Sequence, residues 1–327
     1  MTVGNPNYDT ALLTMTLEKF LSKQPADAVF EKLTLFEWLN AKGSVKKRVD
    51  GGVKLLVPLM YGKNSTAQSY RGYDVLDIAP QEGFTNAEFD MKQYNVAITI
   101  SGREEELNAG EAQMIDLLEA KWDQARMSLR DLLNHDAYGD GTANNGKAIT
   151  GLSLMIDSAG TYGNINRATN SWWAAQENAV DGPLVIDGED GMRRMYNDCS
   201  LGKGAMVPDG ILTTQELFER YEALMAPYLR YTVQGEASAT FVHDNLKFRK
   251  AQLMWDEECP TGVMFFLNSQ VIELRVKRDF TVVPFQRPIN QDAKVAHVRW
   301  MGELVAKNCR HLGKMTGVTD EAPGEGE

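Results

Sequence analysis

Residues 53–78 read VKLLVPLMYGKNSTAQSYRGYDVLDI, and this stretch decides the fold prediction. Every second residue from Val53 to Tyr61 is apolar or aromatic, which is the pattern of a strand with one apolar face. A polar segment over 62–66 interrupts the pattern, and a second run over 70–78 is again rich in apolar and aromatic residues. We therefore predict that the two runs pair as a long two-stranded arm.

An arm of this kind needs something to pack against. Strands of about 10–15 residues at about 3.3 Å per residue would project about 30–50 Å, and an isolated hairpin is marginally stable in water. We therefore expect the apolar side of the arm to lie against another subunit, with Lys63 and Arg71 pairing with acidic residues there. The candidates for contacts between subunits are Leu59, Tyr61, Lys63, Tyr70, Arg71, Tyr73, Glu104 and Glu105.

A strand and a long helix are predicted after the arm. Residues 95–101 alternate as a half-buried strand, and residues 110–138 repeat apolar side chains along one helical face. A helix of this length would measure about 42 Å at 1.5 Å per residue, against a mean of about 11–12 residues in globular proteins. Long arms and long helices also occur in oligomeric enzymes, so this pattern alone leaves both classes open.

Several stretches taken together, and in this order, resemble the major capsid proteins of tailed bacteriophages with the Hong Kong 97-like fold. The resemblance extends from about Tyr8 to Val318. The stretches are VPLMYGKNSTAQSYRGYDVLD (57–77), QYNVAITISGREEELN (93–108), GEAQMIDLLEAKWDQARMSLRDLLN (110–134), YGDGTANNGKAITGL (138–152) and GNINRATNSWW (163–173).

The resemblance implies an α+β fold with a characteristic order of parts. We expect strands at 263–267, 271–278 and 294–305, the last two completing a peripheral sheet, and a helix over 214–225 in a compact domain. The implied parts are an N-terminal arm (1–47), an extended E-loop hairpin (48–93), a peripheral domain with a spine helix and a β-sheet (94–148), a compact axial domain (149–262), a return to the peripheral sheet (263–318) and a disordered acidic tail (319–327).

The function that the resemblance implies is that of the major capsid protein of a phage head. Such a protein self-assembles into hexamers and pentamers, and these form an icosahedral shell around double-stranded DNA in the virion. We expect assembly in the host cytoplasm, a separate scaffolding protein and a portal, room for a decoration protein, and noncovalent procapsid maturation. Two alternatives remain open: an encapsulin-like compartment shell, and a cytoplasmic oligomeric enzyme with its site in residues 150–290.

The composition of the chain argues against several classes of partner and site. The formal net charge of −11 argues against avid nonspecific DNA binding, which depends on Lys and Arg neutralising phosphates, so we expect DNA to be enclosed without sequence-specific binding. The three cysteines form no CxxC pair, which predicts neither a disulfide framework nor a zinc site. No apolar run approaches the ~20 residues that span a bilayer, and residues 1–7 lack the pattern of a signal peptide.

No catalytic, cofactor-binding or metal-binding site is predicted. Residues 141–147 match the spacing of a phosphate-binding loop, but Ala148 stands where that loop needs Ser or Thr, and the segment follows a helix rather than a strand. The four histidines are dispersed, and no G-x-S-x-G elbow is present. The pair Trp172 and Trp173 suggests a stacking platform, but without an evident basic groove we predict that both rings serve packing.

Overall fold

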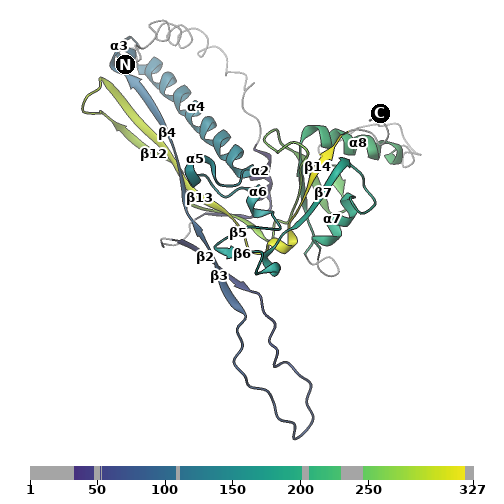
Figure 1. Ribbon diagram of the computed structural model, residues 1–327. Helices are drawn as coiled ribbons and strands as arrows, with labels where there is room; N and C mark the ends of the chain where they lie inside the picture. Colours follow the sequence, from purple (N-terminus) through teal and green to yellow (C-terminus); the bar gives the residue numbers. More distant parts are fainter. Residues whose placement is uncertain are drawn as a thin grey trace.

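The computed structural model describes residues 33–47, 52, 54–107, 111–200, 206–229 and 246–320 of the 327-residue chain. Two β-sheets with attached helices form the body, and an arm projects from it (Figure 1). The elements before residue 150 are α2 (Thr34–Ala41), β1 (Val45–Lys47), β2 (Lys54–Met60), β3 (Phe84–Asp90), β4 (Lys92–Ser101), α3 (Gly102–Leu107), α4 (Glu111–Tyr138) and α5 (Ala143–Gly146). The later elements are α6 (Leu152–Met155), β5 (Thr161–Tyr162), β6 (Ile165–Asn166), η1 (Ser171–Trp173), β7 (Gln176–Pro183), α7 (Met192–Asp198), β8 (Gly210–Thr213), α8 (Gln215–Leu229), β9 (Lys247–Phe248), β10 (Ala251–Trp255), β11 (Met264–Leu267), β12 (Ile272–Gln286), β13 (Ala293–Ala306), η3 (Cys309–His311) and β14 (Gly313–Thr319).

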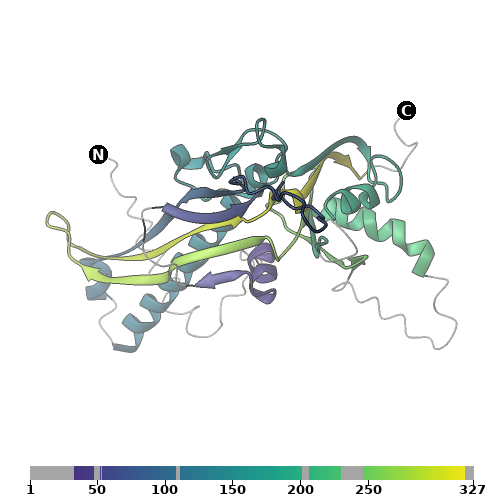
Figure 2. The same cartoon turned by 90° about the horizontal axis from the view of Figure 1, so that it is seen from below.

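A four-stranded sheet and the long helix α4 form one half of the body. The strand order is β1-β12-β13-β4, in which β1 is parallel to β12 and the other neighbours are antiparallel. Ile98 and Ile100 are buried on one face of β4, as the alternating sequence predicts. Helix α4 packs along β4 (Figure 2). Its buried residues Leu129 and Leu133 lie one helical turn apart.

The second half is a compact six-stranded sheet with α7 and α8 packed against it. Its strand order is β7-β14-β11-β8-β10-β9, and its core includes Met192 and Tyr196 of α7 and Leu217 and Tyr221 of α8. The prediction that all of 263–318 returns to the peripheral sheet is wrong. Only β12 and β13 join the four-stranded sheet, because β11 reads MFFL with every residue buried and therefore occupies the centre of the six-stranded sheet, beside β8 and β14.

Only part of the predicted N-terminal arm lies within the described residues. Helix α2 belongs to this arm, and it ends before Gly43, whose φ of 72° is favourable for glycine. Strand β1 then pairs with β12 at Val45↔Leu274. Residues 1–32 of the predicted arm and most of the predicted acidic tail fall outside the described residues.

The arm differs from its prediction in how its strands pair. Strand β2 pairs with β3 in the register Lys54↔Asp90 to Met60↔Phe84, not with residues 70–78, and residues 61–83 contain no strand. The reason is burial: FTNAEFD (84–90) places Ala87 and Phe89 in the core on alternate positions. The run over 70–78 has no such sustained alternation, and Gly72 turns the backbone with a φ of 53°.

The apolar face of β2 is also placed differently from the prediction. Leu55, Val57 and Leu59 are buried in the core of their own chain. The expectation that Leu59 contacts another subunit is therefore not supported, because its side chain is only 6 % exposed before any assembly.

Candidate assembly surface

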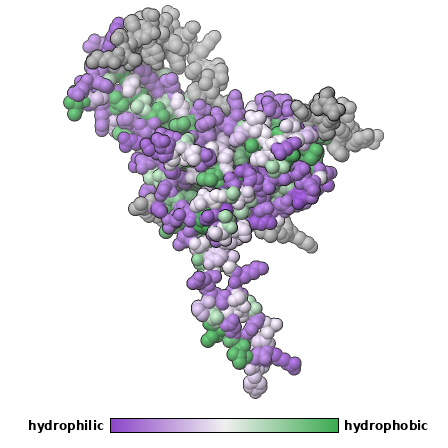
Figure 3. Space-filling view, in the orientation of Figure 1, coloured by the Kyte–Doolittle hydropathy of each residue, from purple (hydrophilic) through white to green (hydrophobic). Residues whose placement is uncertain are grey.

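The exposed apolar side chains of the described residues gather on the arm. We call residues 61–83 the distal loop; it projects beyond β2 and β3 (Figure 1). Of thirteen large apolar residues with exposed side chains, nine lie between positions 56 and 84, and apolar surface is visible on the arm in Figure 3. The nine are Leu56, Met60, Tyr61, Tyr70, Tyr73, Val75, Leu76, Ile78 and Phe84. Monomeric proteins rarely expose such contiguous patches, so this surface has the character of an interaction site.

Contacts within the distal loop are local. At its base Tyr61 N donates to Gly83 O at 2.9 Å, and the two backbones pass so closely that a Cβ on Gly62 would lie 3.0 Å from the Cα of Gly83. Farther out, the Ser65 hydroxyl donates to Gln81 Oε1 at 2.9 Å. The described contacts of the loop do not bury its apolar side chains, whose burial therefore requires another molecule.

The base of the arm is anchored rigidly to the body by the small hairpin β5–β6. Glu88 N donates to Gly163 O at 3.0 Å, and the Phe89 ring meets Tyr162 edge-on with centroids 5.0 Å apart. Gly163 has a φ of 59°, and a Cβ there would lie 2.9 Å from the Cβ of Ala87. Glycine is therefore required at this point of contact.

An aromatic stack marks the place where the distal loop leaves the body. Tyr61 stacks on Trp172 with ring centroids 5.1 Å apart and planes inclined by 17°. Behind it Trp173 is buried, and its Nε1 donates to Tyr162 O at 3.0 Å. Trp173 serves packing as predicted, whereas Trp172 is only partly buried and stacks under the base of the loop.

Sequence reasoning missed a basic groove beside this stack. A cavity of about 400 Å³ is lined by Tyr61, Trp172, Lys307 and Arg310, among others. The two cations follow β13, more than 130 positions after Trp172, so a scan for local basic runs could not connect them with the aromatic pair.

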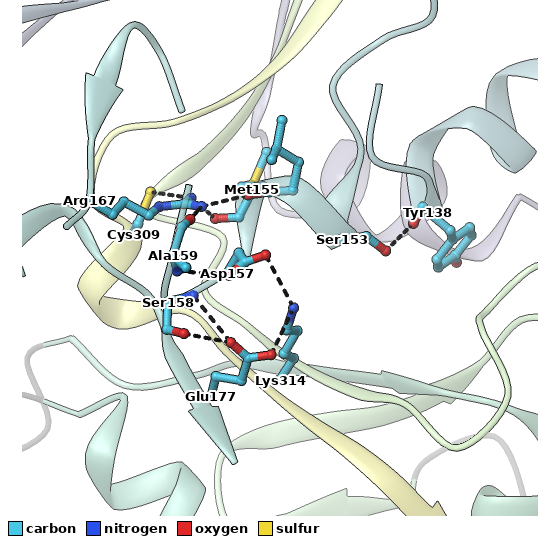
Figure 4. Close-up of polar contacts among 11 residues, drawn as sticks. Tyr138, Ser153, Met155, Asp157, Ser158, Ala159, Arg167, Glu177, Cys309 and Lys314 are labelled. Carbon is cyan, nitrogen blue, oxygen red and sulfur yellow. Dashed lines mark hydrogen bonds and ion pairs between the residues drawn. The ribbon is translucent and has the colours of Figure 1, made fainter. Parts of the chain in front are cut away.

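A polar network holds the segment that carries the aromatic stack (Figure 4). Arg167 is buried and donates to the backbone carbonyls of Leu154, Met155 and Ala159 at 2.9, 2.7 and 3.1 Å. These carbonyls accept from both terminal nitrogens of the buried guanidinium and the Tyr162 ring lies 5.2 Å from it, whereas Arg167 Nε has no hydrogen-bond partner among the described residues.

A second set of contacts in the same view ties this segment to β14. Glu177 accepts from the Ser158 hydroxyl at 2.7 Å and pairs with Lys314 at 3.1 Å. Burial raises the pKa of Glu177, but the Ser158 hydrogen bond and the Lys314 ammonium outweigh it and hold this pKa below its ordinary value. The ionised carboxylate of Glu177, on β7, therefore links Ser158 to Lys314 on β14 of the six-stranded sheet.

The remaining predicted contact residues separate into two groups. Lys63, Tyr70, Arg71 and Tyr73 are exposed on the distal loop, and their contact with another subunit remains a prediction. Glu104 and Glu105 lie in α3, at the opposite end of the molecule (Figure 1).

Glu104 already has partners in its own chain. It pairs with Lys121 at 3.0 Å, and it forms a capping box in which Ser101 N donates to its carboxylate and the Ser101 hydroxyl accepts from its backbone N–H. A pairing of Lys63 or Arg71 with Glu104 would thus compete with existing contacts.

Features of catalysis or metal binding are not brought together in the part of the chain that the structure describes. Residues 141–147 follow α4 and form a tight turn in which Asn144 and Asn145 have positive φ, unlike a phosphate-binding loop. No cluster of three or more potential ligands among His, Cys, Asp and Glu occurs within the described ranges. Cys199, Cys259 and Cys309 are buried free thiols, and burial raises the pKa of Cys309 to about 12. The described helices include none that is long and apolar enough to cross a membrane.

Comparison with known proteins gives matches at the level of structure. No family model matches the chain, and no curated protein matches it. A chain of the Cyanophage A-1(L) capsid asymmetric unit is 14 % identical, with a TM-score of 0.62 over 91 % of this chain and 96 % of that one. A chain of the holo-SrpI encapsulin complex from Synechococcus elongatus PCC 7942 is 11 % identical, with a TM-score of 0.58 over 95 % and 96 %. A chain from Mycobacterium phage Bobi is 13 % identical, with a TM-score of 0.56 over 90 % and 93 %.

These matches extend over nearly the whole of both chains in each case, so they concern the complete architecture rather than one domain. The α+β fold prediction is confirmed: the chain has the Hong Kong 97-like fold of phage capsid and encapsulin shell proteins.

Proposed function

We propose that this chain is the major capsid protein of a tailed phage, which self-assembles into hexamers and pentamers and forms an icosahedral shell around double-stranded DNA. The observation that carries the proposal is the arm. Its base is built into the core, whereas its distal loop presents fully exposed apolar side chains such as Tyr73 and Val75. A shell protein uses such a surface between copies of itself, and the full-length likeness to a capsid chain supports that use.

In this proposal, assembly is driven by binding energy that is distributed over many contacts, and it requires no catalytic step. The distal loop lies across a neighbouring copy, the six-stranded half packs around the local symmetry axis, and residues 1–47 reach over neighbours. The net charge of −11 suits a container that encloses DNA without gripping its phosphates. A scaffolding protein, a portal and room for a decoration protein belong to the same proposal, as does noncovalent maturation.

The first experiment tests shell formation itself. Purified protein is concentrated and followed by sedimentation velocity and negative-stain electron microscopy. The proposal expects closed particles much larger than any compact oligomer; a single small oligomer at all concentrations would favour the enzyme alternative with a site in residues 150–290.

A second candidate function is an encapsulin-like compartment shell, which the match to an encapsulin chain over 95 % of this chain supports. The contents of particles isolated from the native source separate the two functions. Nuclease-protected double-stranded DNA is expected for a phage head, and a stoichiometric enclosed protein without DNA is expected for a compartment. Boiling in SDS and reductant should release single chains, because we propose no covalent cross-link; a ladder of multimers would contradict that part.

A further inference from the structure

A groove remains open at the base of the arm. We call it the root groove and define it by Met60, Tyr61, Trp172, Lys307 and Arg310. It is lined by residues at the end of β2, in η1 and in the connection from β13 to η3. Met60 is 74 % exposed and Tyr61 43 % exposed, so its apolar wall is accessible.

The root groove carries positive charge. Lys307 pairs with Glu273, but that carboxylate is shared with Arg275 at 3.2 Å, so two cations face one anion. Arg310 donates to the backbone carbonyl of Asp198 at 2.9 Å. Because this acceptor is neutral, the hydrogen bond does not cancel the positive charge of the guanidinium. Of the described residues that line the cavity, none is acidic. The groove therefore suits a segment that combines carboxylates with apolar side chains.

A segment of that chemistry is present on the returning half of the distal loop. Residues 73–82 read YDVLDIAPQE, with three acidic residues and no basic residue. Asp74 Oδ2 accepts from Arg71 N at 2.8 Å and Asp77 Oδ1 accepts from Ala79 N at 2.9 Å, which orients each carboxylate while its other oxygen remains available. Val75 and Ile78, at 94 % and 91 % exposed, lie beside these carboxylates in the sequence.

Residues 73–78 lie near the middle of the distal loop, which extends away from its own base (Figure 1), whereas Gln81 and Glu82 lie close to that base, beside Ser65 and Gly62. Contact of Asp74 and Asp77 with the groove therefore needs two copies. We propose that the acidic segment 73–82 of one copy docks in the root groove of a second copy, with Asp74 and Asp77 facing Lys307 and Arg310. Because the two surfaces differ, the contact is head-to-tail, and repeated contacts of this type close into rings when the rotation permits. This inference rests on the proposed function and names the surface that receives the loop.

Charge reversal with rescue tests the contact. Asp77→Arg alone and Arg310→Glu alone each place like charges together and should raise the protein concentration needed for shells about ten-fold or more. A chain carrying both changes restores the attraction and should assemble near the wild-type concentration. Lys250→Glu, a reversal at an exposed lysine outside the groove, is the matched control and should assemble as the wild type does.

Thermal melting of each unassembled variant separates a lost contact from a damaged fold. The single variants should melt within a few degrees of the wild type. If Arg310→Glu melts far lower, Arg310→Gln together with Asp77→Asn replaces the test, and both should weaken assembly without a repulsive pair.

Disulfide trapping reports the contact directly. One chain with Asp77→Cys is mixed with another chain with Arg310→Cys, and oxidation should link the two during assembly, whereas Lys250→Cys with Asp77→Cys should not link. The docking inference is overturned, and the proposed function stands, if the wild type forms shells while the doubly reversed chain is not rescued and the two cysteine chains do not link. Absence of wild-type shells would overturn the proposed function itself. Truncation after Thr319 should leave assembly unchanged; loss of shells would instead assign the groove to the acidic residues 320–327 of a second copy.

Discussion

Replacing Tyr73, Val75 and Ile78 together by serine should abolish assembly and leave the monomer as stable as before. The three side chains are 105 %, 94 % and 91 % exposed, so their removal takes no contact from the folded chain. In a shell, each of them would be buried against a neighbour.

The size of the effect follows from that exposure. Burying an apolar side chain of this size is worth about 1.5–3 kcal/mol, so the three substitutions together remove about 4–9 kcal/mol of burial per neighbouring contact before association costs. Even about 1.4 kcal/mol lost per contact would raise the concentration needed for assembly about ten-fold. The loss is repeated at every subunit, so closed shells should disappear at concentrations where the wild type forms them.

The assay combines sedimentation velocity with thermal unfolding of the unassembled chain. Val57→Ser is the matched control, since Val57 is 1 % exposed within the chain's own core; it should lower the melting temperature of the monomer. If the triple variant still forms normal shells, or if it unfolds the monomer as Val57→Ser does, then the distal loop is not an assembly surface.

Three further outcomes are expected. Glu303 is fully buried, and burial raises its pKa to about 7. The unassembled protein should therefore lose stability as pH rises from about 4.5 to about 7, because in this range the unfolded chain gives up the proton more easily than the folded chain does. Urea titrations at about pH 5 and about pH 8 should show this loss for the wild type and not for Glu303→Gln, and an equal loss in both proteins would contradict the assignment. Trp172→Ala removes the platform under Tyr61 and should cost about 0.5–1.5 kcal/mol beyond the lost burial, measured by denaturant unfolding, whereas a cost near zero would show that the stack holds nothing. Gly163→Ala forces a Cβ against Ala87 at positive φ and should destabilise by about 1–3 kcal/mol, so an unaffected melting temperature would contradict the close packing under β3.

The sequence alone predicted those strands and helices in which one buried face sets the spacing of the apolar residues. Alternation over 53–61 and 95–101 identified β2 and most of β4, and the helical repeat located α4 within a residue of its start. In each case one buried face dictates the period, so local residues carry the information.

Pairing and sheet membership could not be obtained in the same way. Strand β2 pairs with β3 because Ala87 and Phe89 pack on the hairpin β5–β6, which lies more than 70 positions later. Strand β11 joins the compact sheet because β8 and β14 pair with its two edges. The residues of β2 or β11 alone do not show which distant segments each strand will pack against.

The candidate site was predicted in part. Exposed apolar and charged residues of the distal loop were identified from composition, but the root groove was not. Its wall comes from β2, η1 and the start of η3, and its charge depends on how Lys307 shares Glu273 with Arg275. Such a surface exists only once distant segments have folded together.

Cryo-electron microscopy of the assembled protein tests the central claim most directly, because it locates the distal loop relative to neighbouring copies. The account predicts closed shells built from rings of five and six chains, with Tyr73, Val75 and Ile78 buried against a neighbour. A compact oligomer, or a shell in which these three side chains remain in solvent, would contradict it.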